Sequence, residues 1–210
     1  MKKALQILFF LVSLFSFSQK TYNFDKELVY LLYKGDEKKN LFEESVFINS
    51  EDNSYFMKIF GSEGQKFALL YDITYNVRHD FDLIKNKEKG EIYFDFKFDR
   101  SINLNLKQKA KNPNFEFSSF ANKRQLIIYK NDKRKSLREI ITYSTKPTDK
   151  NLFFAFRAIA LHPFELNQDF DSNENILVEN AKIVKEKQTL NYELKFTKDV
   201  DLTLEIPAKN

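Results

Sequence analysis

Residues 91–100 read Glu-Ile-Tyr-Phe-Asp-Phe-Lys-Phe-Asp-Arg, and their pattern indicates the class of fold. Phe94, Phe96 and Phe98 occupy every second position, with charged residues between them. Successive side chains of a β-strand leave on opposite faces of the sheet, so this alternation predicts a strand with one dry face and one wet face. The three phenylalanines then share the dry face.

The same period of two recurs along most of the chain. Short polar segments separate the runs, which favours hairpins and antiparallel pairing. No proline- or serine-rich linker interrupts the pattern. We therefore expect a single antiparallel β-rich domain over residues 19–210, with about ten strands. The predicted strands, in addition to residues 92–98, lie at residues 28–33, 46–48, 55–60, 67–73, 77–83, 102–106, 126–129, 140–143, 190–196 and 200–206.

One segment departs from the period of two. Residues 150–161 follow Asp149, whose side chain can cap a helix, and Pro163 would end that helix. Apolar residues surround the helical axis, and Arg157 is the only charge after the first residue. Such a helix must be covered on most sides. The predicted fold class is therefore mainly β (α+β): a curved antiparallel sheet or half-barrel of about ten strands that packs on one apolar helix. The alternative for this segment is a buried strand pair or an irregular loop.

Residues 1–18 are typical of a secretory signal peptide. Lys2 and Lys3 precede an apolar run over residues 4–17, and Ser16 and Ser18 place small residues at the −3 and −1 positions of a cleavage site. The run is shorter than the roughly 20 residues that span a bilayer. We therefore predict export after removal of residues 1–18, to the periplasm or the outer surface of a Gram-negative bacterium, in keeping with the Lys, Asn and Phe bias.

Composition argues against several function classes. Loss of Lys2 and Lys3 lowers the formal net charge from +4 to +2 (4 − 2 = 2), which argues against nucleic-acid binding by bulk charge. The chain has no Cys, four Gly and two His, so it has no Cys-ligated metal, glycine-rich phosphate loop or His-rich metal site. No serine lies in a nucleophile-elbow context. We therefore expect no enzymatic activity, no metal and no cofactor.

His79, Asp80 and Asp82 form the densest polar cluster. On a strand, alternation turns His79 toward the core and both carboxylates away from it, so the three do not converge on one metal or substrate. We expect a hydrogen-bonded His79 at the sheet edge of the core and two solvent-facing aspartates.

A basic stretch brackets residues 126–129 and would give a hairpin a cationic tip. Either it contacts anionic lipid heads or lipopolysaccharide phosphates, or it discourages aggregation through a sheet edge. Its members are Lys123, Arg124, Lys130, Lys133, Arg134, Lys135 and Arg138.

The export signal, the period-two strands and the apolar helix together resemble the half-barrel (LolA/LolB-like) lipoprotein-carrier family of the bacterial envelope. Proteins of that family wrap a strongly curved antiparallel sheet around helices and have an apolar concave cavity. The resemblance covers the mature chain and carries no motif residues, and this chain has fewer predicted helices than the family. It implies a non-enzymatic carrier with an apolar ligand.

Phenylalanine is unusually frequent, with 23 among 210 residues. The rings either fill the core or line an apolar ligand pocket. The leading hypothesis is an exported, non-enzymatic envelope protein that binds a lipid or another apolar ligand on the concave face of the sheet, with at most peripheral membrane contact. The alternative is a structural or protein-interaction module without a pocket. The candidate pocket residues are Phe94, Phe96, Phe98, Phe153, Phe156 and Arg157.

Overall fold

The computed structural model describes residues 20–35, 37–62, 65–88, 91–104, 114–120, 123–131, 133–161, 172, 174–186 and 188–207. The predicted signal peptide and Pro163 lie outside these residues. Eleven strands form one antiparallel sheet in the order β6-β5-β4-β3-β2-β1-β11-β10-β9-β8-β7. Together with one described helix, this sheet confirms the predicted mainly β (α+β) class.

Consecutive strands pair with each other from β1 to β6 and again from β7 to β11. The pairing of β1 with β11 joins these two runs in the middle of the sheet. Their bounds are β1 Lys20–Lys34, β2 Phe42–Asn49, β3 Asp52–Ser62, β4 Gln65–Asp72, β5 Val77–Glu88, β6 Glu91–Asn103, β7 Asn114–Phe120, β8 Lys123–Tyr129, β9 Leu137–Pro147, β10 Ile176–Lys185 and β11 Gln188–Ile206. The helix α3 spans Phe153–Ala160.

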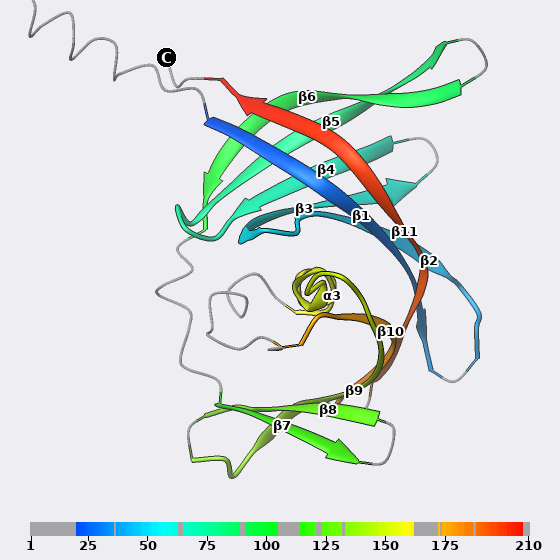
Figure 1. Cartoon of the computed structure of the whole chain (residues 1–210), viewed down its shortest axis with the longest axis vertical. Coiled ribbons are helices and arrows are strands. Elements are labelled where there is room, and N and C mark those ends of the chain that lie inside the picture. Colours follow the sequence, from blue (N-terminus) through cyan, green and yellow to red (C-terminus); the bar gives the residue numbers. More distant parts are fainter. Residues whose placement is uncertain are drawn as a thin grey trace, which may run out of the picture.

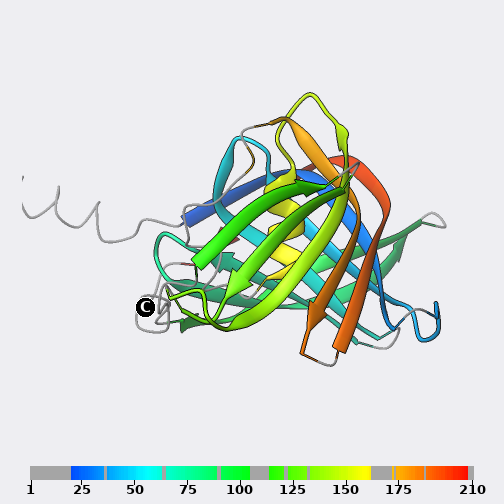
Figure 2. The ribbon, with the colours of Figure 1, turned by 90° about the horizontal axis from the view of Figure 1, so that it is seen from below.

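The sheet is strongly curved (Figure 1). β1 and β11 run side by side through its middle and bend together, and α3 lies on the concave side, between β2 and β3 on one hand and β8 and β9 on the other. The view from below shows α3 enclosed between these two layers (Figure 2). The curvature therefore supplies the cover that an all-round apolar helix requires.

Two bulges contribute to the bend of β11. The sequence predicts separate strands at residues 190–196 and 200–206, but the structure joins them into one. Its register against β1 shifts between Phe24 and Lys26 and again between Val29 and Tyr30, with the extra residue on β11 each time. A bulge bends the strand that carries it and increases its twist. The prediction of two strands was wrong because the polar residues Thr197, Lys198 and Asp199 are exposed and yet continue the pairing with β1 without a break.

Two hydrophobic cores lie on opposite sides of β2 and β3. Val46 and Ile48 pack in the core that contains α3, whereas Phe47, between them, packs in a second core. On β3, Phe56 belongs to the α3 core and Met57 to the second core. The second core also takes residues from the N-terminal half of β1, from β4 and β5, and from the C-terminal end of β11. The strand alternation thus makes β2 and β3 a wall between the two cores.

The helix is shorter than predicted. It begins after Leu152 rather than at residue 150, and Asp149 does not cap it. The preceding segment instead continues the hydrogen bonding of the sheet region, because Leu152 N donates to the carbonyl O of Ile176 at 2.9 Å. Asn151 Oδ1 accepts from Phe153 N at 3.0 Å and satisfies one N–H of the first turn.

We predict that Phe156→Ala destabilises the fold by about 3–5 kcal/mol, because this ring is fully enclosed and its loss leaves a cavity. Phe156 packs against the rings of Tyr30, Tyr143 and Tyr192 at centroid distances of 6.0–6.3 Å. The control Phe96→Ala, on the end strand β6, removes a half-buried ring and should cost about 1 kcal/mol. Urea unfolding measures both, and equal losses would contradict the placement of α3 in the core.

Candidate functional site

The three predicted pocket residues on α3 lie in the middle of the concave side. Phe153, Phe156 and Arg157 are 0%, 1% and 4% exposed. Phe153 packs against Tyr143 and Phe117 at 5.6 and 6.3 Å, and so reaches β9 and β7. The guanidinium carbon of Arg157 lies 5.9 Å from the centre of the Phe154 ring, at cation–π distance. The rings therefore fill the concave side as a packed core.

The predicted pocket residues on β6 lie on the side of the second core, and two of them pack against it. Phe94, Phe96 and Phe98 are half-buried, and Phe96 and Phe98 pack around Phe81 of β5 at 6.3 and 5.8 Å. Phe94 instead lies 5.1 Å from Lys66 Nζ. The structure therefore does not bring the β6 phenylalanines together with Phe153, Phe156 and Arg157, because the wall of β2 and β3 stands between them. Ligand binding at either group stays a prediction.

A lysine holds the C-terminal turn of α3. Lys58 Nζ on β3 donates to the carbonyl O of Ile159 at 3.1 Å and lies 3.7 Å from Glu44 Oε2 on β2. Burial lowers the pKa of the Lys58 ammonium, and the neighbouring Glu44 carboxylate opposes that shift. A cation at a helix C-terminus satisfies orphan carbonyls and suits the helix dipole. This hydrogen bond joins the last turn of α3 to β3.

Buried tyrosines give the concave side neutral polar groups. Burial raises the pKa of Tyr143 to about 12 and raises the pKa values of Tyr30 and Tyr192 as well. Tyr30 Oη donates to the carbonyl O of Val178 at 2.8 Å. These phenols therefore stay protonated at neutral pH and bring no charge to the surface around Phe156.

A buried polar network closes one end of the second core. Asp72, 2% exposed, forms an ion pair with Lys20 and accepts from Tyr22 Oη at 2.7 Å. Tyr22 Oη also lies 3.2 Å from His79 Nε2, and His79 Nδ1 lies 2.7 Å from Ser101 Oγ. Burial, followed by the bond to Asp72, raises the pKa of Tyr22.

This network resembles a nucleophile–base pair in one respect, the short distance between Ser101 and His79. The other ring nitrogen of His79, however, lies 3.2 Å from the phenol of Tyr22, which stays neutral, whereas a serine–histidine pair of a hydrolase has a carboxylate at that position. The contacts satisfy buried polar groups. The predicted hydrogen-bonded His79 at the core is confirmed.

The prediction for Asp80 was wrong, whereas Asp82 is exposed as expected. Asp80 is 7% exposed and pairs with two arginines. Arg78 Nε lies 2.6 Å from Asp80 Oδ1, and Arg100 Nε lies 3.2 Å from Asp80 Oδ2. Alternation correctly separates Asp80 from His79, but the side chains of Arg78 and Arg100 lie against the Asp80 carboxylate and cover it.

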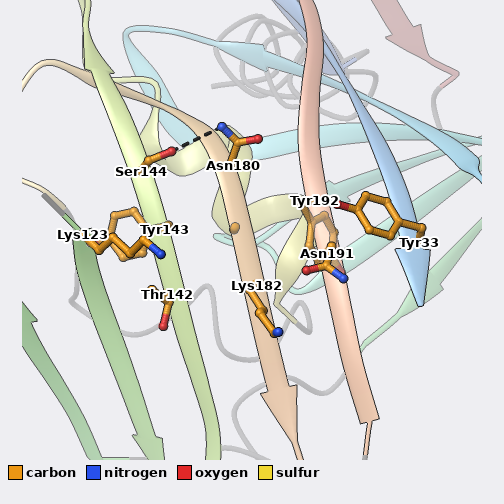
Figure 3. Close-up of a pocket in the computed structure, with 10 residues that line it drawn as sticks. Tyr33, Lys123, Thr142, Tyr143, Ser144, Asn180, Lys182, Asn191 and Tyr192 are labelled. Carbon is orange, nitrogen blue, oxygen red and sulfur yellow. Dashed lines mark hydrogen bonds between the residues drawn. The ribbon is translucent and has the colours of Figure 1, made fainter. Parts of the chain in front are cut away.

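The outer face of the sheet carries a polar hollow of about 360 Å³ across β1, β8, β9, β10 and β11. We call it the outer hollow (Figure 3). The rings of Tyr143 and Tyr192 lie behind their strands in this view, toward α3. The sequence shows the alternating polar positions of these strands, but not that they converge. The lining residues are Tyr33, Lys123, Thr142, Tyr143, Ser144, Asn180, Ala181, Lys182, Asn191 and Tyr192.

The described residues contain neither a metal-binding group of side chains nor a helix that could span a membrane. Among the residues that the structure describes, no group of three or more His, Cys, Asp or Glu side chains is arranged to hold a metal ion. Within the same part of the chain, no helix has the length and apolar character needed to cross a bilayer.

No protein-family model matches the chain, and no curated protein does. Among solved structures, the chain is similar to one described as a LolA superfamily protein from Nitrosomonas europaea, with 10% sequence identity and a TM-score of 0.32. The match covers 86% of this chain and 87% of that chain. The architecture thus resembles that of a LolA superfamily protein.

We predict that Tyr22→Phe destabilises the protein by about 1.5–3 kcal/mol, because it removes a hydrogen bond to the charged and buried Asp72. The matched control is Tyr55→Phe, whose lost hydroxyl donates to the carbonyl O of Asn23 at 2.8 Å and accepts from Asn49 Nδ2 at 3.1 Å and from Asn23 N at 3.3 Å. All of these partners are neutral, so the loss should be about 1 kcal/mol. Urea unfolding of both variants at neutral pH makes the comparison. A loss of stability for Tyr22→Phe no larger than that for Tyr55→Phe would show that the hydrogen bond to Asp72 stabilises the fold no more than hydrogen bonds to neutral groups.

Proposed function

We propose that the protein is an exported, non-enzymatic binding protein for an apolar molecule such as an acyl chain, held in the concave space that α3 fills. The observation that carries the proposal is the burial of α3. Seven of its eight residues, from Phe153 to Ile159, are buried, on every side of the helix. The sheet therefore presents a curved apolar surface to a short element that joins it mainly through burial.

Several features favour α3 as an element that can give way. A helix of eight residues is too short to be stable alone, so its structure depends on the sheet around it. Its N-cap residue Leu152 provides no side-chain hydrogen bond, so Asn151 satisfies one N–H of the first turn. The hydrogen bond from Lys58 to the last turn opposes release and sets part of its cost. An acyl chain that buries a similar apolar area would replace the lost contacts at about 25 cal/mol per Å². The rings then fill the core in the empty state and yield to the ligand.

An apolar track connects this core with solvent. Leu32 on β1 packs against the α3 core and pairs with Phe42 at the start of β2. Phe42 is 61% exposed and Leu41 beside it is 49% exposed. Phe42 is two and four residues from Glu44 and Val46, so alternation puts it on the same face of β2 as the α3 core. This rim would be the entrance for the ligand.

We expect saturable binding of 11-(dansylamino)undecanoic acid, with competition by palmitate, because the concave surface is apolar and curved around one chain-sized element. Hydrogen exchange followed by mass spectrometry should show faster exchange of the α3 amides in the complex. Binding without any change in α3, or with greater protection there, would place the ligand elsewhere. The absence of saturable binding by fatty acids and phospholipids would refute the proposal.

We further predict that Lys58→Met raises the affinity for the dansylated fatty acid about threefold to tenfold, since it releases the C-terminal turn of α3 and keeps an apolar stem. Its matched control is Lys195→Met, which breaks a lysine–glutamate pair with Glu43 on the outer face of the sheet. The control should leave the affinity unchanged. Equal affinities for both variants would argue against displacement of α3.

A structural or protein-interaction module is the second candidate, and the open sheet favours it. β6 and β7 are the end strands of the sheet, and β6 is 13 residues long. An unpaired strand edge can accept a strand from a partner. A stoichiometric protein partner in envelope extracts, combined with no lipid binding, would favour this candidate over the first.

A further inference from the structure

We propose that the outer hollow is a second binding site, for a sugar ring that carries a phosphate or carboxylate group. The site lies on the face of the sheet opposite α3 and is independent of the apolar site proposed above. Strand register brings cations, hydrogen-bond acceptors and an aromatic ring together in this hollow.

Strand register places the polar lining residues on one face. Thr142, Lys182 and Asn191 are direct neighbours on β9, β10 and β11, and Tyr33 of β1 continues the row beyond Asn191. Ser144 and Asn180 form a parallel row two residues along, and Lys123 of β8 lies at the far side. Residues two apart on a strand share a face, so the side chains of both rows point outward together. Figure 3 shows them grouped on these strands.

The charged groups of the hollow are all cationic. Lys123 and Lys182 bring two ammonium groups, and none of the ten described lining residues carries a carboxylate. Glu193, a described acid next to the hollow, pairs with Asn180 across the strands and forms an ion pair with Lys38 Nζ at 2.5 Å. The local charge therefore favours an anion, although the whole chain carries only +4.

The hollow also offers acceptors, which a site for a bare anion would not need. Asn191 Nδ2 donates to the carbonyl O of Gly35, and Asn180 Nδ2 donates to Ser144 Oγ at 3.4 Å. These bonds turn both amide oxygens toward the strip between β10 and β11, where Figure 3 shows them. Amide oxygens accept hydrogen bonds from hydroxyl groups, as do Thr142 and Ser144. The ligand therefore has hydroxyl donors in addition to its negative charge.

Tyr33 completes the match with a sugar. Its ring borders the hollow next to Asn191. Lys38 Nζ, which pairs with Glu193, lies 5.9 Å from the centre of this ring. An aromatic ring gives an apolar platform with a polar tip, suited to a ring that has both C–H and O–H surfaces. The volume of about 360 Å³ lies within the range of small-molecule sites. Cations, acceptors and a ring together fit a negatively charged sugar unit.

The test is a calorimetric and NMR titration of the purified protein with glucose 1-phosphate, glucuronate, glucose and inorganic phosphate. We expect glucose 1-phosphate and glucuronate to bind at least tenfold more tightly than glucose or phosphate, with affinity that falls as salt rises. Lys182→Gln and Lys123→Gln should each weaken binding at least fivefold. The control Lys97→Gln, an exposed lysine on β6 with the same change of charge, should alter it less than twofold.

Tyr33 gives a second, uncharged test. Tyr33→Ala should weaken binding of the charged sugars at least fivefold, while Tyr33→Phe keeps the ring and should change it less than twofold. Phosphate that binds as tightly as glucose 1-phosphate would overturn the assignment, because it would show that the amide oxygens and Tyr33 contribute nothing. Equal effects of Lys182→Gln and Lys97→Gln would also overturn it.

The sugar can belong to a soluble glycan or to a lipid headgroup, and vesicles distinguish the two sources. Phosphatidylcholine vesicles that contain phosphatidylinositol are compared with vesicles that contain phosphatidylglycerol, which has equal charge and no ring. Preference for phosphatidylinositol that depends on Lys182, without binding of the soluble sugars, assigns a headgroup. Binding of the soluble sugars assigns a glycan, and binding of neither refutes the site. None of these results changes the exchange of α3, so this proposal and the apolar site fail separately.

Discussion

A β-strand sends successive side chains to opposite faces, and the architecture depends on how β2 and β3 use this constraint. Val46 and Ile48 face α3, whereas Phe47 faces the second core. Both faces of the same two strands are therefore apolar and covered, which an ordinary half-exposed antiparallel sheet does not require. The helix α3 covers one face of β2 and β3, and the bent ends of β1 and β11 cover the other face. A slip of one residue in this register would exchange the two cores.

The packing of α3 serves stability and limits function at once. Each enclosed phenylalanine contributes about 2–3 kcal/mol through burial, so the helix contributes a large share of a stability that is small in total. A ligand in the same space must offset that share before it gains any affinity. The short length of α3 and the absence of a side-chain hydrogen bond from its N-cap residue Leu152 lower the cost of displacement, whereas the hydrogen bond from Lys58 raises it. The entropy released when eight residues leave the core also lowers this cost.

Local pattern predicted most of the elements and did not predict their assembly. Alternation identified nine of the eleven described strands but missed β7 and β10, and the apolar segment near Phe156 indicated a buried helix. The continuity of β11 was missed because the exposed polar residues 197–199 look like a turn in the sequence and yet pair with β1. Phe94 and Phe153 were grouped in one pocket, but the structure places them on opposite sides of β2 and β3. Which core a strand residue joins depends on how distant strands curve over it, and the local sequence does not show this. The outer hollow was missed for the same reason. Its polar residues look like ordinary exposed positions on each strand, and only the register between strands brings them side by side.

The two proposed sites share one layer of protein. Tyr143 and Tyr192 line the outer hollow from beneath and contact the ring of Phe156 at 6.3 and 6.0 Å on the concave side. Departure of α3 removes these contacts, so β9 and β11 are then held at this point by the sheet hydrogen bonds and by the ligand. Coupling between the sites follows only if the hollow has a different affinity for its sugar in the two states, and by linkage the same factor would act on the apolar ligand. Because the backbone ladder joins β9, β10 and β11 whether or not α3 is in place, the hollow keeps its main-chain frame in both states, and the two sites bind their ligands independently.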